Sequence, residues 1–272
     1  MITVRDQMGI ETTIASAQRI ISLVPSQTEL LFDLGLGHRI VGVTKFCVHS
    51  IEAKNKVIIG GTKNFRFDII DLLQPDLIIG NKEENYEEGV NQLRIKYSVW
   101  MSDIFNRKDA QEMIAAVSGI TDTHASGEKI IASIADEFSQ LLKFPPLRTL
   151  YLIWKNPWMA VGTNTFIHSL LEETGLINAL SEERYPELTI EKIKSLAPQL
   201  ILLSSEPYPF KEKHMEELQQ LAPDAKICLV DGELFSWYGS RLIKAPAYFN
   251  SLRSILLNFK TYNLHVIPKI RI

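Results

Sequence analysis

The most constraining feature of this sequence is a phrase that occurs twice. Residues 67–79 (FDIIDLLQPDLII) return as residues 190–202 (IEKIKSLAPQLIL), and each copy predicts a short helix followed by a buried strand. Residues 19–36 and 148–176 show a second, weaker similarity to each other. The chain is therefore predicted to form two similar α/β lobes. Clefts between two such lobes are common ligand sites.

Length and composition permit two modest domains and argue against a nucleic-acid-binding protein. The 272 residues are 46% hydrophobic and 22% charged, with a formal net charge of -3, so no basic surface is expected for a nucleic-acid partner. Cys47 and Cys228 are the two cysteines and form no CxxC motif. They predict free thiols, without a disulfide framework or a zinc knuckle.

The first residues do not resemble a secretion signal. Arg5, Asp6 and Glu11 interrupt the apolar core that a signal requires, and the segment alternates like a strand. No apolar stretch reaches the ~18 residues that span a bilayer. We expect a chain without a signal peptide or membrane span.

Short apolar runs alternate with helical segments along the chain, which favours parallel sheets covered on both faces. Buried strands are predicted at 20–24, 39–44, 56–59, 77–79, 147–154 and 226–230. Helices are predicted at 28–34, 109–120, 165–174 and from Pro246 to about Asn258, and the tail 261–272 is expected to be irregular or strand-like.

A longer helix is predicted between the two halves of the repeat. Ile130, Ile134 and Phe138 recur at helical spacing, and Pro145-Pro146 would end the helix. The predicted domains are an N-terminal lobe (1–121), a bridging helix (122–146) and a C-terminal lobe (147–272). A packed helix within a single domain is the alternative.

Loops at the ends of the predicted strands are rich in aromatic residues. Ring faces suit an extended conjugated or macrocyclic ligand, and Trp158 and Trp237 are expected to be exposed to the cleft, whereas Trp154 could be core or ligand contact. Ser26 is interpreted as a residue of the N-cap region, beside helix amides that could bond a ligand. The candidate ligand contacts are Pro25, Ser26, Phe46, His49, Asn64, Arg66, Trp154, Trp158, Tyr208, Trp237, Tyr238 and Arg241.

Enzyme and metal signatures are scarce. The sequence contains no G-x-S-x-G, P-loop or G-x-G-x-x-G motif, so we expect a protein that is not an enzyme. Of the histidines, His49 alone lies in a candidate loop, near Cys47. Two residues without obvious partners do not make a metal site, so no metal ligands are assigned.

Asp68 and Glu191 occupy equivalent positions in the two copies of the phrase, each seven residues before the repeated proline. An acidic residue in the first turn of a helix stabilises the helix dipole, which accounts for each residue separately. Their symmetric placement also fits a two-fold partner that binds both lobes.

Several segments resemble one family. Residues 19–29 (RIISLVPSQTE), 34–44 (LGLGHRIVGVT), 74–79 (QPDLII) and 162–175, with the Pro198 phrase, are similar to substrate-binding proteins of ABC importers. The resemblance is to the helical-backbone metal receptor group, which binds cobalamin, haem or iron siderophores, and is strongest to its cobalamin-binding members.

The resemblance implies an α/β fold with two Rossmann-like lobes, each with a parallel sheet, joined by a single long bridging helix. It implies a monomer that binds a metal chelate in the inter-lobe cleft, carries no resident cofactor, and docks on a dimeric ABC permease through Asp68 and Glu191. The location implied is periplasmic or at the cell surface if a signal was removed, and cytoplasmic if Met1 is the native start.

Two alternatives remain open at this point. One is a cytosolic metal-chelate-binding or metallocentre protein, or an enzyme, on the same scaffold, suggested by the missing signal and by Cys47 and His49. The other is a zinc or manganese receptor, against which the scattered histidines argue.

Overall fold

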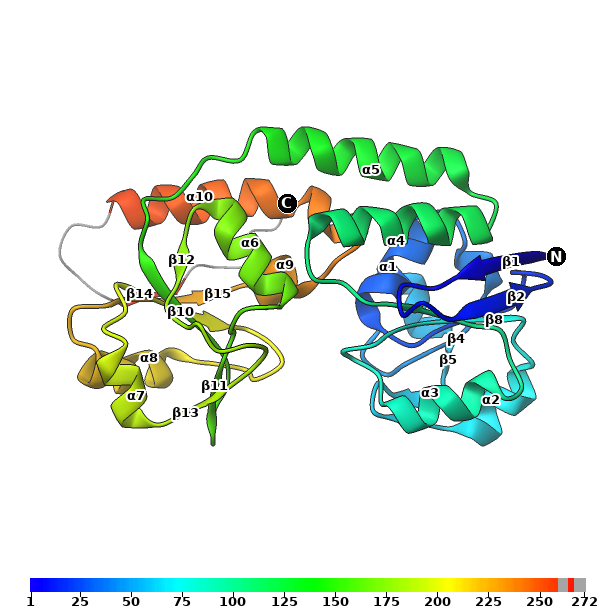
Figure 1. The fold of residues 1–272 in the computed structure, drawn as a ribbon, viewed down its shortest axis with the longest axis horizontal. Helices are drawn as coiled ribbons and strands as arrows, with labels where there is room; N and C mark the ends of the chain where they lie inside the picture. The colour runs from blue at the N-terminus through cyan, green and yellow to red at the C-terminus, as the bar shows by residue number, and fades with distance from the viewer. Residues whose placement is uncertain (259–263, 267–272) are drawn as a thin grey trace. The chain divides into compact units, whose positions relative to one another are not determined.

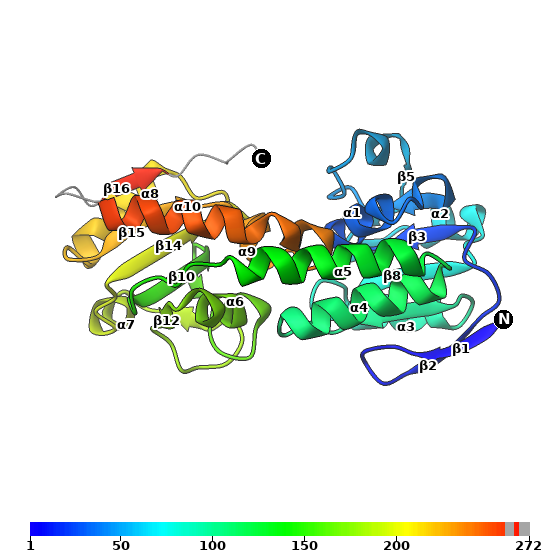
Figure 2. The ribbon, with the colours of Figure 1, turned by 90° about the horizontal axis from the view of Figure 1, so that it is seen from above.

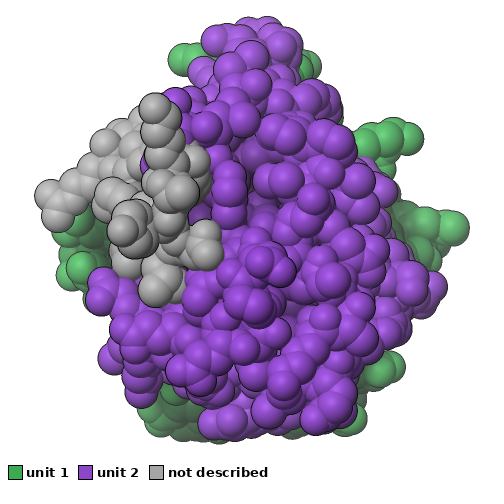
Figure 3. Space-filling model, turned by 90° about the vertical axis from the view of Figure 1, so that its left-hand side faces the viewer, with its two compact units in different colours: residues 1–104, 108–135, 238–241 green, residues 105–107, 136–237, 242–272 purple. Residues whose placement is uncertain are grey.

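The computed structural model describes residues 1–258 and 264–266. The chain divides into two compact units, which Figure 3 colours separately. Unit 1 comprises residues 1–104, 108–135 and 238–241, and unit 2 comprises residues 105–107, 136–237 and 242–272. Among the described residues, no helix is both long and apolar enough to cross a membrane.

Unit 1 is built on a five-stranded parallel sheet with the order β5-β4-β3-β8-β9. Its strands are β3 (Ile20–Ser22), β4 (Ile40–Val43), β5 (Val57–Ile58), β8 (Leu77–Asn81) and β9 (Val99–Ser102). The helices are α1 (Pro25–Asp33), α2 (Phe67–Leu73), α3 (Glu87–Arg94), α4 (Arg107–Ile120) and α5 (His124–Ser139), with 3-10 turns η1 (Gly37–Arg39) and η2 (Ile51–Asn55).

Helices cover both faces of this sheet, which explains why β3, β8 and β9 are buried throughout. In Figure 1, α2 and α3 lie on one side of the sheet, and α4 and α5 on the other. Ile70 of α2 and Leu93 of α3 pack against Ile21 and Ile78 of the sheet. The expectation of a buried strand at 56–59 was partly wrong, because Val57 and Ile58 form a two-residue edge strand with exposed side chains.

Two hairpins complete unit 1. The strand expected at the N-terminus is confirmed as an antiparallel pair, β1 (Ile2–Arg5) and β2 (Glu11–Ile14), and a second pair is β6 (Gly60–Gly61) and β7 (Asn64–Phe65). The first hairpin is attached to the edge of the sheet, since Gln7 donates its amide to the carbonyl of Met101 at 3.1 Å.

Unit 2 contains a mixed sheet with the order β13-β11-β10-β14-β15-β16, in which β12 also pairs with β10. The strands are β10 (Arg148–Trp154), β11 (Trp158–Ala160), β12 (Ile177–Asn178), β13 (Glu187–Leu188), β14 (Leu200–Ser204), β15 (Lys226–Val230) and β16 (Leu264–Val266). The helices are α6 (Phe166–Thr174), α7 (Ile190–Ser195), α8 (Glu212–Leu221), α9 (Gly232–Ser236) and α10 (Ala245–Asn258), with a 3-10 turn η3 (Ser240–Ile243). The pairings of β11 are antiparallel and the remaining ones parallel, so this sheet is not purely parallel as expected.

The doubled phrase is confirmed as a repeated helix and strand, α2 with β8 and α7 with β14. In each copy the residue before the proline has a positive φ, 43° at Gln74 and 43° at Ala197. Proline disfavours helical geometry in the residue that precedes it, so α2 ends at Leu73, two residues before Pro75, and α7 at Ser195, three residues before Pro198.

The helix predicted between the halves is α5, which is shorter than expected. It ends at Ser139 rather than at Pro145-Pro146, because the following backbone bonds to α10: the Leu142 amide donates to Asn250 Oδ1 at 2.8 Å, and Arg253 donates to the Lys143 carbonyl at 2.6 Å. The division of the chain into units falls within α5, after Ala135.

The first half of α5 packs along α4, and the two helices lie side by side in Figures 1 and 2. A side chain at Gly127 of α5 would collide with Ser118 of α4, so glycine permits this close approach. The predicted last helix is confirmed as α10, with Pro246 as its second residue. Of the tail predicted at 261–272, only β16 lies within the described residues.

Candidate functional site

The carboxyl ends of the parallel strands are the places where open α/β sheets bind ligands. We call edge 1 the residues at and after the ends of β3, β4, β8 and β9, together with Asn64, Arg66 and residues 238–241, all in unit 1. Edge 2 comprises the residues of unit 2 that follow β10 and β14, and those that follow β15 up to Trp237. Each edge contains several of the predicted ligand contacts.

At edge 1, Pro25 and Ser26 open helix α1. The N-cap is Val24, which makes no side-chain cap, so the expectation that Ser26 belongs to the N-cap region was wrong by two positions. Ser26 is buried beside the Tyr238 side chain. Pro25 is only partly buried. The start of this helix therefore contributes a packed polar contact as well as backbone amides.

The loop after β4 presents Phe46 and turns Cys47 inward. Phe46 is 49% exposed, with the Lys45 ammonium 5.0 Å from the centre of its ring. The Cys47 thiol is buried and accepts a hydrogen bond from Thr28 Oγ1 at 3.0 Å, and burial raises its pKa. His49 is half-buried. Within the described part of the chain, no group of three His, Cys, Asp or Glu side chains is placed to hold a metal ion.

Asn64 and Arg66 are exposed on and after β7. The Arg66 guanidinium lies 3.3 Å from the carboxylate of Asp68, so it is paired with one of the two predicted docking residues. Both partners of this ion pair are largely exposed to solvent, which limits what the pair contributes to stability.

Edge 1 also contains a buried amide network that the sequence interpretation did not assign. Asn85 Oδ1 accepts the amide of Asn81 at 2.9 Å, and Asn85 Nδ2 donates to the Thr62 carbonyl at 3.1 Å. Gln27 Nε2 donates to Ser102 Oγ at 2.7 Å, and Asn81 Nδ2 donates to the same oxygen at 3.0 Å. The sequence signal for this network was the position of Asn81 and Asn85, at and soon after the end of a buried strand.

Tyr238 and Arg241 were predicted as contacts of the C-terminal lobe, but both belong to unit 1. The Arg241 guanidinium makes a bidentate ion pair with Glu29 of α1, at 2.7 and 2.8 Å. Gly239, between Tyr238 and Arg241, has a φ of +110°, a conformation that favours glycine. The segment can therefore lie against the backbone of Ser26. The Tyr238 ring is buried beside Ser26 and Ser102, and this burial raises its pKa.

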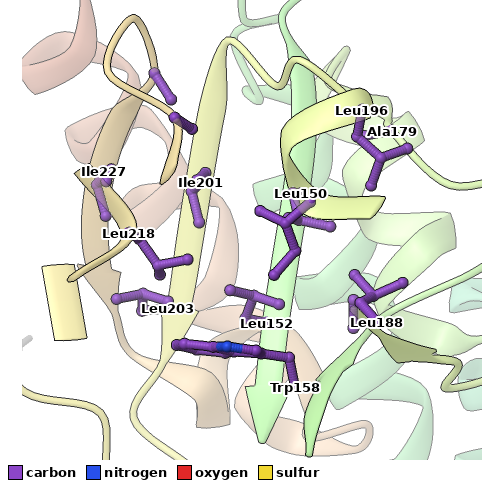
Figure 4. Close-up of a cluster of buried hydrophobic side chains, with 14 of the residues drawn as sticks. Leu150, Leu152, Trp158, Ala179, Leu188, Leu196, Ile201, Leu203, Leu218 and Ile227 are labelled. Carbon is purple, nitrogen blue, oxygen red and sulfur yellow. The ribbon is translucent and has the colours of Figure 1, made fainter. Parts of the chain in front are cut away.

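At edge 2, Trp158 is buried, so its predicted exposure was wrong. It is 7% exposed and stacks on Phe210 with ring centres 6.1 Å apart. Figure 4 shows its indole lying flat beside Leu152 and Leu203 in the core of unit 2. Trp158 is the first residue of β11, a short strand that runs back antiparallel to β10. Its side chain therefore packs on the sheet and joins the core, although its sequence neighbours resemble a loop.

Trp154 and Tyr208 form the exposed aromatic pair of edge 2. Trp154, for which both outcomes were open, is 39% exposed, and its ring meets that of Tyr208 edge-on with centres 5.5 Å apart. Tyr208 is half-buried and also contacts Phe210 and His214. These two rings provide the apolar surface that a planar ligand could contact.

Trp237 is also buried, at 7% exposure, and its predicted exposure was wrong. Its indole Nε1 donates to Glu206 Oε1 at 2.8 Å, and Ser236 Oγ donates to the same oxygen at 3.1 Å. Burial, followed by the nearby charge of Glu233, raises the pKa of Glu206 despite these hydrogen bonds. Glu206 was not assigned as a contact from the sequence, although an acidic residue soon after a buried strand was the available signal.

The predicted docking residues Asp68 and Glu191 are exposed in the first turns of α2 and α7. The pKa of Glu191 is lowered, first by a hydrogen bond from its own backbone amide and then by the Thr189 side chain. Thr189 also caps α7, accepting the Lys192 amide at 3.1 Å, whereas α2 has no side-chain cap. Symmetry of position therefore does not extend to the surroundings of the two carboxylates.

Comparison with known proteins assigns the chain to a family. The model of the family described as "Periplasmic binding protein" matches residues 20–226. A vitamin B12-binding protein of Vibrio cholerae is 26% identical over 195 residues, which are 69% of this chain and 71% of the relative. A vitamin B12-binding protein of Yersinia pseudotuberculosis is 23% identical over 196 residues, or 70% of each chain.

Solved structures show the same fold. The periplasmic vitamin B12 binding protein BtuF of Vibrio cholerae superimposes with a TM-score of 0.76 at 21% identity, covering 89% of this chain and 99% of that one. The periplasmic heme-binding protein RhuT from Roseiflexus sp. RS-1 gives a TM-score of 0.74 at 20% identity, covering 88% and 97%. With a family match that spans more than half of its residues, the chain belongs to the periplasmic binding protein family.

Proposed function

We propose that this protein captures a metal chelate of the cobalamin or haem type and delivers it to an ABC importer. The observation that carries the proposal is the family match over residues 20–226, which extends through most of both α/β units. Relatives that cover about 70% of this chain are vitamin B12-binding proteins, and similar folds bind haem. These relatives are binding proteins, which supports a function in capture rather than catalysis.

Each edge, taken by itself, has exposed side chains that suit such a ligand. Phe46 at edge 1 and the pair Trp154 and Tyr208 at edge 2 supply ring surface, and Lys45 and Arg66 supply cations and hydrogen-bond donors. A large conjugated ligand gains most from apolar contact with such rings, while polar groups orient it. We infer that these residues, more than the buried Trp158 and Trp237, provide direct contacts.

Titration of the purified protein tests the proposal directly. Cyanocobalamin, haemin and a ferric siderophore are added in turn and followed by absorbance and calorimetry. We expect one of them to bind with micromolar or tighter affinity, and absence of binding by all three would overturn the proposal.

Single variants then locate the contacts. Trp154→Ala should weaken binding by ~1 kcal/mol, because an exposed ring is lost from the ligand surface. Leu72→Ala is the matched control, since Leu72 is 79% exposed on α2, away from the carboxyl end of the sheet. Equal affinities of the Trp154 variant and the wild type would remove Trp154 from the site.

The partner and the location are further parts of the proposal. Exposed Asp68 and Glu191, one on each copy of the repeated helix, are proposed to dock on an ABC permease, which would place the protein on the periplasmic or outer face of the membrane. The double variant Asp68→Lys, Glu191→Lys should bind the chelate normally but fail to stimulate the ATPase of the reconstituted importer. The double variant Glu212→Lys, Glu216→Lys, at two exposed positions of α8, is the charge-matched control. Undiminished stimulation by the double variant would reject this docking surface.

A further inference from the structure

Glu206 lies at the carboxyl end of β14 in an arrangement that fixes one of its two oxygens. Trp237 Nε1 donates to Oε1 at 2.8 Å, and Ser236 Oγ lies 3.1 Å from the same oxygen, with its single proton shared with the Gly232 carbonyl at 2.9 Å. Among the described residues, no hydrogen bond to Oε2 accompanies them. The side chain is partly exposed. The carboxylate is therefore held in one orientation, with its second oxygen available as an acceptor.

The groups around Glu206 make its negative charge unfavourable. Glu233 of α9 and Asp231, the N-cap of α9, are both nearly buried and repel the carboxylate. The neutral hydroxyl of Tyr151, on β10, is directed to Ser204 at 3.3 Å. Lys155, the cation that follows β10, is paired with Glu217. A carboxylate kept in such surroundings while oriented by the indole N–H of Trp237 is typical of a functional position.

The chemistry of this acceptor discriminates between ligand classes. An ionised carboxylate accepts hydrogen bonds and donates none, so it favours amide N–H groups. A ligand carboxylate placed at the same point would be repelled, with Glu233 and Asp231 adding to the repulsion. Cobalamin carries neutral amides around its corrin ring, whereas haem carries two propionates.

We propose that Glu206 is a specificity-determining residue of this binding protein, accepting an amide N–H of the ligand and rejecting a carboxylate at that position. The inference rests on the proposed function and narrows it: the ligand class is a neutral, amide-bearing corrinoid rather than a dicarboxylate tetrapyrrole such as haem.

Matched ligands test this inference. The probes are cyanocobalamin and its b-, d- and e-monocarboxylates, in which one peripheral amide is hydrolysed, together with haemin. At neutral pH the wild type should bind cyanocobalamin about tenfold or more tightly than at least one monocarboxylate. This preference should shrink at mildly acidic pH, as Glu206 takes up a proton.

The Glu206→Gln variant sharpens the test. The substituted side chain can still accept from Trp237 and Ser236 through its carbonyl oxygen, which turns its NH₂ group toward the ligand position. The preference should therefore fall to about threefold or reverse, without dependence on pH. Glu216→Gln removes one negative charge at an exposed residue of α8 and is the control. It should retain the preference of the wild type.

The outcomes separate the inference from the proposed function. Equal binding of cyanocobalamin and all its monocarboxylates by the wild type, or an unchanged preference in Glu206→Gln, would overturn the inference and leave the function standing. A similar loss of preference in Glu216→Gln would also overturn it, since the effect would then be long-range. If the wild type binds neither corrinoids, haemin nor a ferric siderophore, the proposed function fails and the inference fails with it.

Discussion

The two copies of the repeated helix and strand end in different chemistry. At the end of β8 in unit 1, the neutral side-chain amides of Asn81 and Asn85 bond to backbone groups: Asn85 accepts the Asn81 backbone amide and donates to the Thr62 carbonyl, and Asn81 donates to the Ser102 carbonyl. After β14 in unit 2, Glu206 is a carboxylate whose pKa is raised by burial and by Glu233. The repeated helix and strand are thus shared, whereas the residues at the strand ends differ: neutral amides at the end of β8 and a carboxylate after β14.

The starts of the repeated helices differ as well. Thr189 caps α7 through its side chain, whereas the N-cap of α2 is Arg66, whose side chain pairs with Asp68 instead. A side-chain cap and an exposed ion pair differ in energy, since the cap satisfies a backbone donor and the ion pair competes with water. Substitutions at the two edges and at the two helix starts should therefore differ in the size of their effects.

The largest effect is expected at edge 1 from Arg241→Met. This change leaves Glu29 without its bidentate partner at a position where both side chains are nearly buried, 10% and 13% exposed. Breaking such a pair should lower the free energy of unfolding by about 3 kcal/mol. Chemical denaturation measures it, with the exposed Arg5→Met as control. A loss no larger than that of the control would show that the pair does not anchor residues 238–241.

Asn85→Ala should follow, with a loss of about 2 kcal/mol. The buried amide of Asn81 then loses its acceptor, and the Thr62 carbonyl loses a donor. The exposed Asn64→Ala should change stability by less than about 0.5 kcal/mol. If thermal and chemical unfolding show similar small losses for both variants, the amide network does not stabilise edge 1 as argued.

A smaller effect should separate the two helix starts. Thr189→Ala removes the cap from the Lys192 amide and should cost about 1 kcal/mol of unfolding free energy. Arg66→Ala removes only an exposed ion pair and should cost less than about 0.5 kcal/mol. Equal losses in denaturation experiments would mean that the caps of α2 and α7 are equivalent after all.

The smallest effect, and the only stabilising one, is expected at edge 2 from Glu206→Gln. The raised pKa means that the folded protein binds a proton at Glu206 more tightly than the unfolded chain does. The ionised carboxylate therefore costs stability at neutral pH, and this cost disappears as the pH falls through the raised pKa toward the ordinary value.

The melting temperature of Glu206→Gln should accordingly exceed that of the wild type at neutral pH, and the two should converge at mildly acidic pH. Thermal unfolding across this range measures the difference, with Glu216→Gln as control. A variant that is less stable than the wild type at neutral pH would show that the hydrogen bonds from Trp237 and Ser236 outweigh the repulsion from Glu233.

Much of the scaffold was predictable because its signals are local. Apolar runs and helical spacing around Pro75 and Pro198 identified both repeated units, and the N-terminal residues of α10 identified its start. The exposure of Trp158 and Trp237 was predicted wrongly from their loop neighbours. Their burial depends on Phe210 and Glu206, which lie far away in the sequence and approach only when the sheet forms.

The repeat, the alternation of strands and helices, and the family all follow from the sequence, since periodicity, proline positions and motifs are readable from neighbouring residues. Three other features are visible only in the folded chain: residues 238–241 join unit 1, Trp154 rather than Trp158 is exposed, and Glu206 is held by Trp237. These features arise from contacts between distant segments, in which burial and hydrogen bonding depend on which side chains the fold brings together.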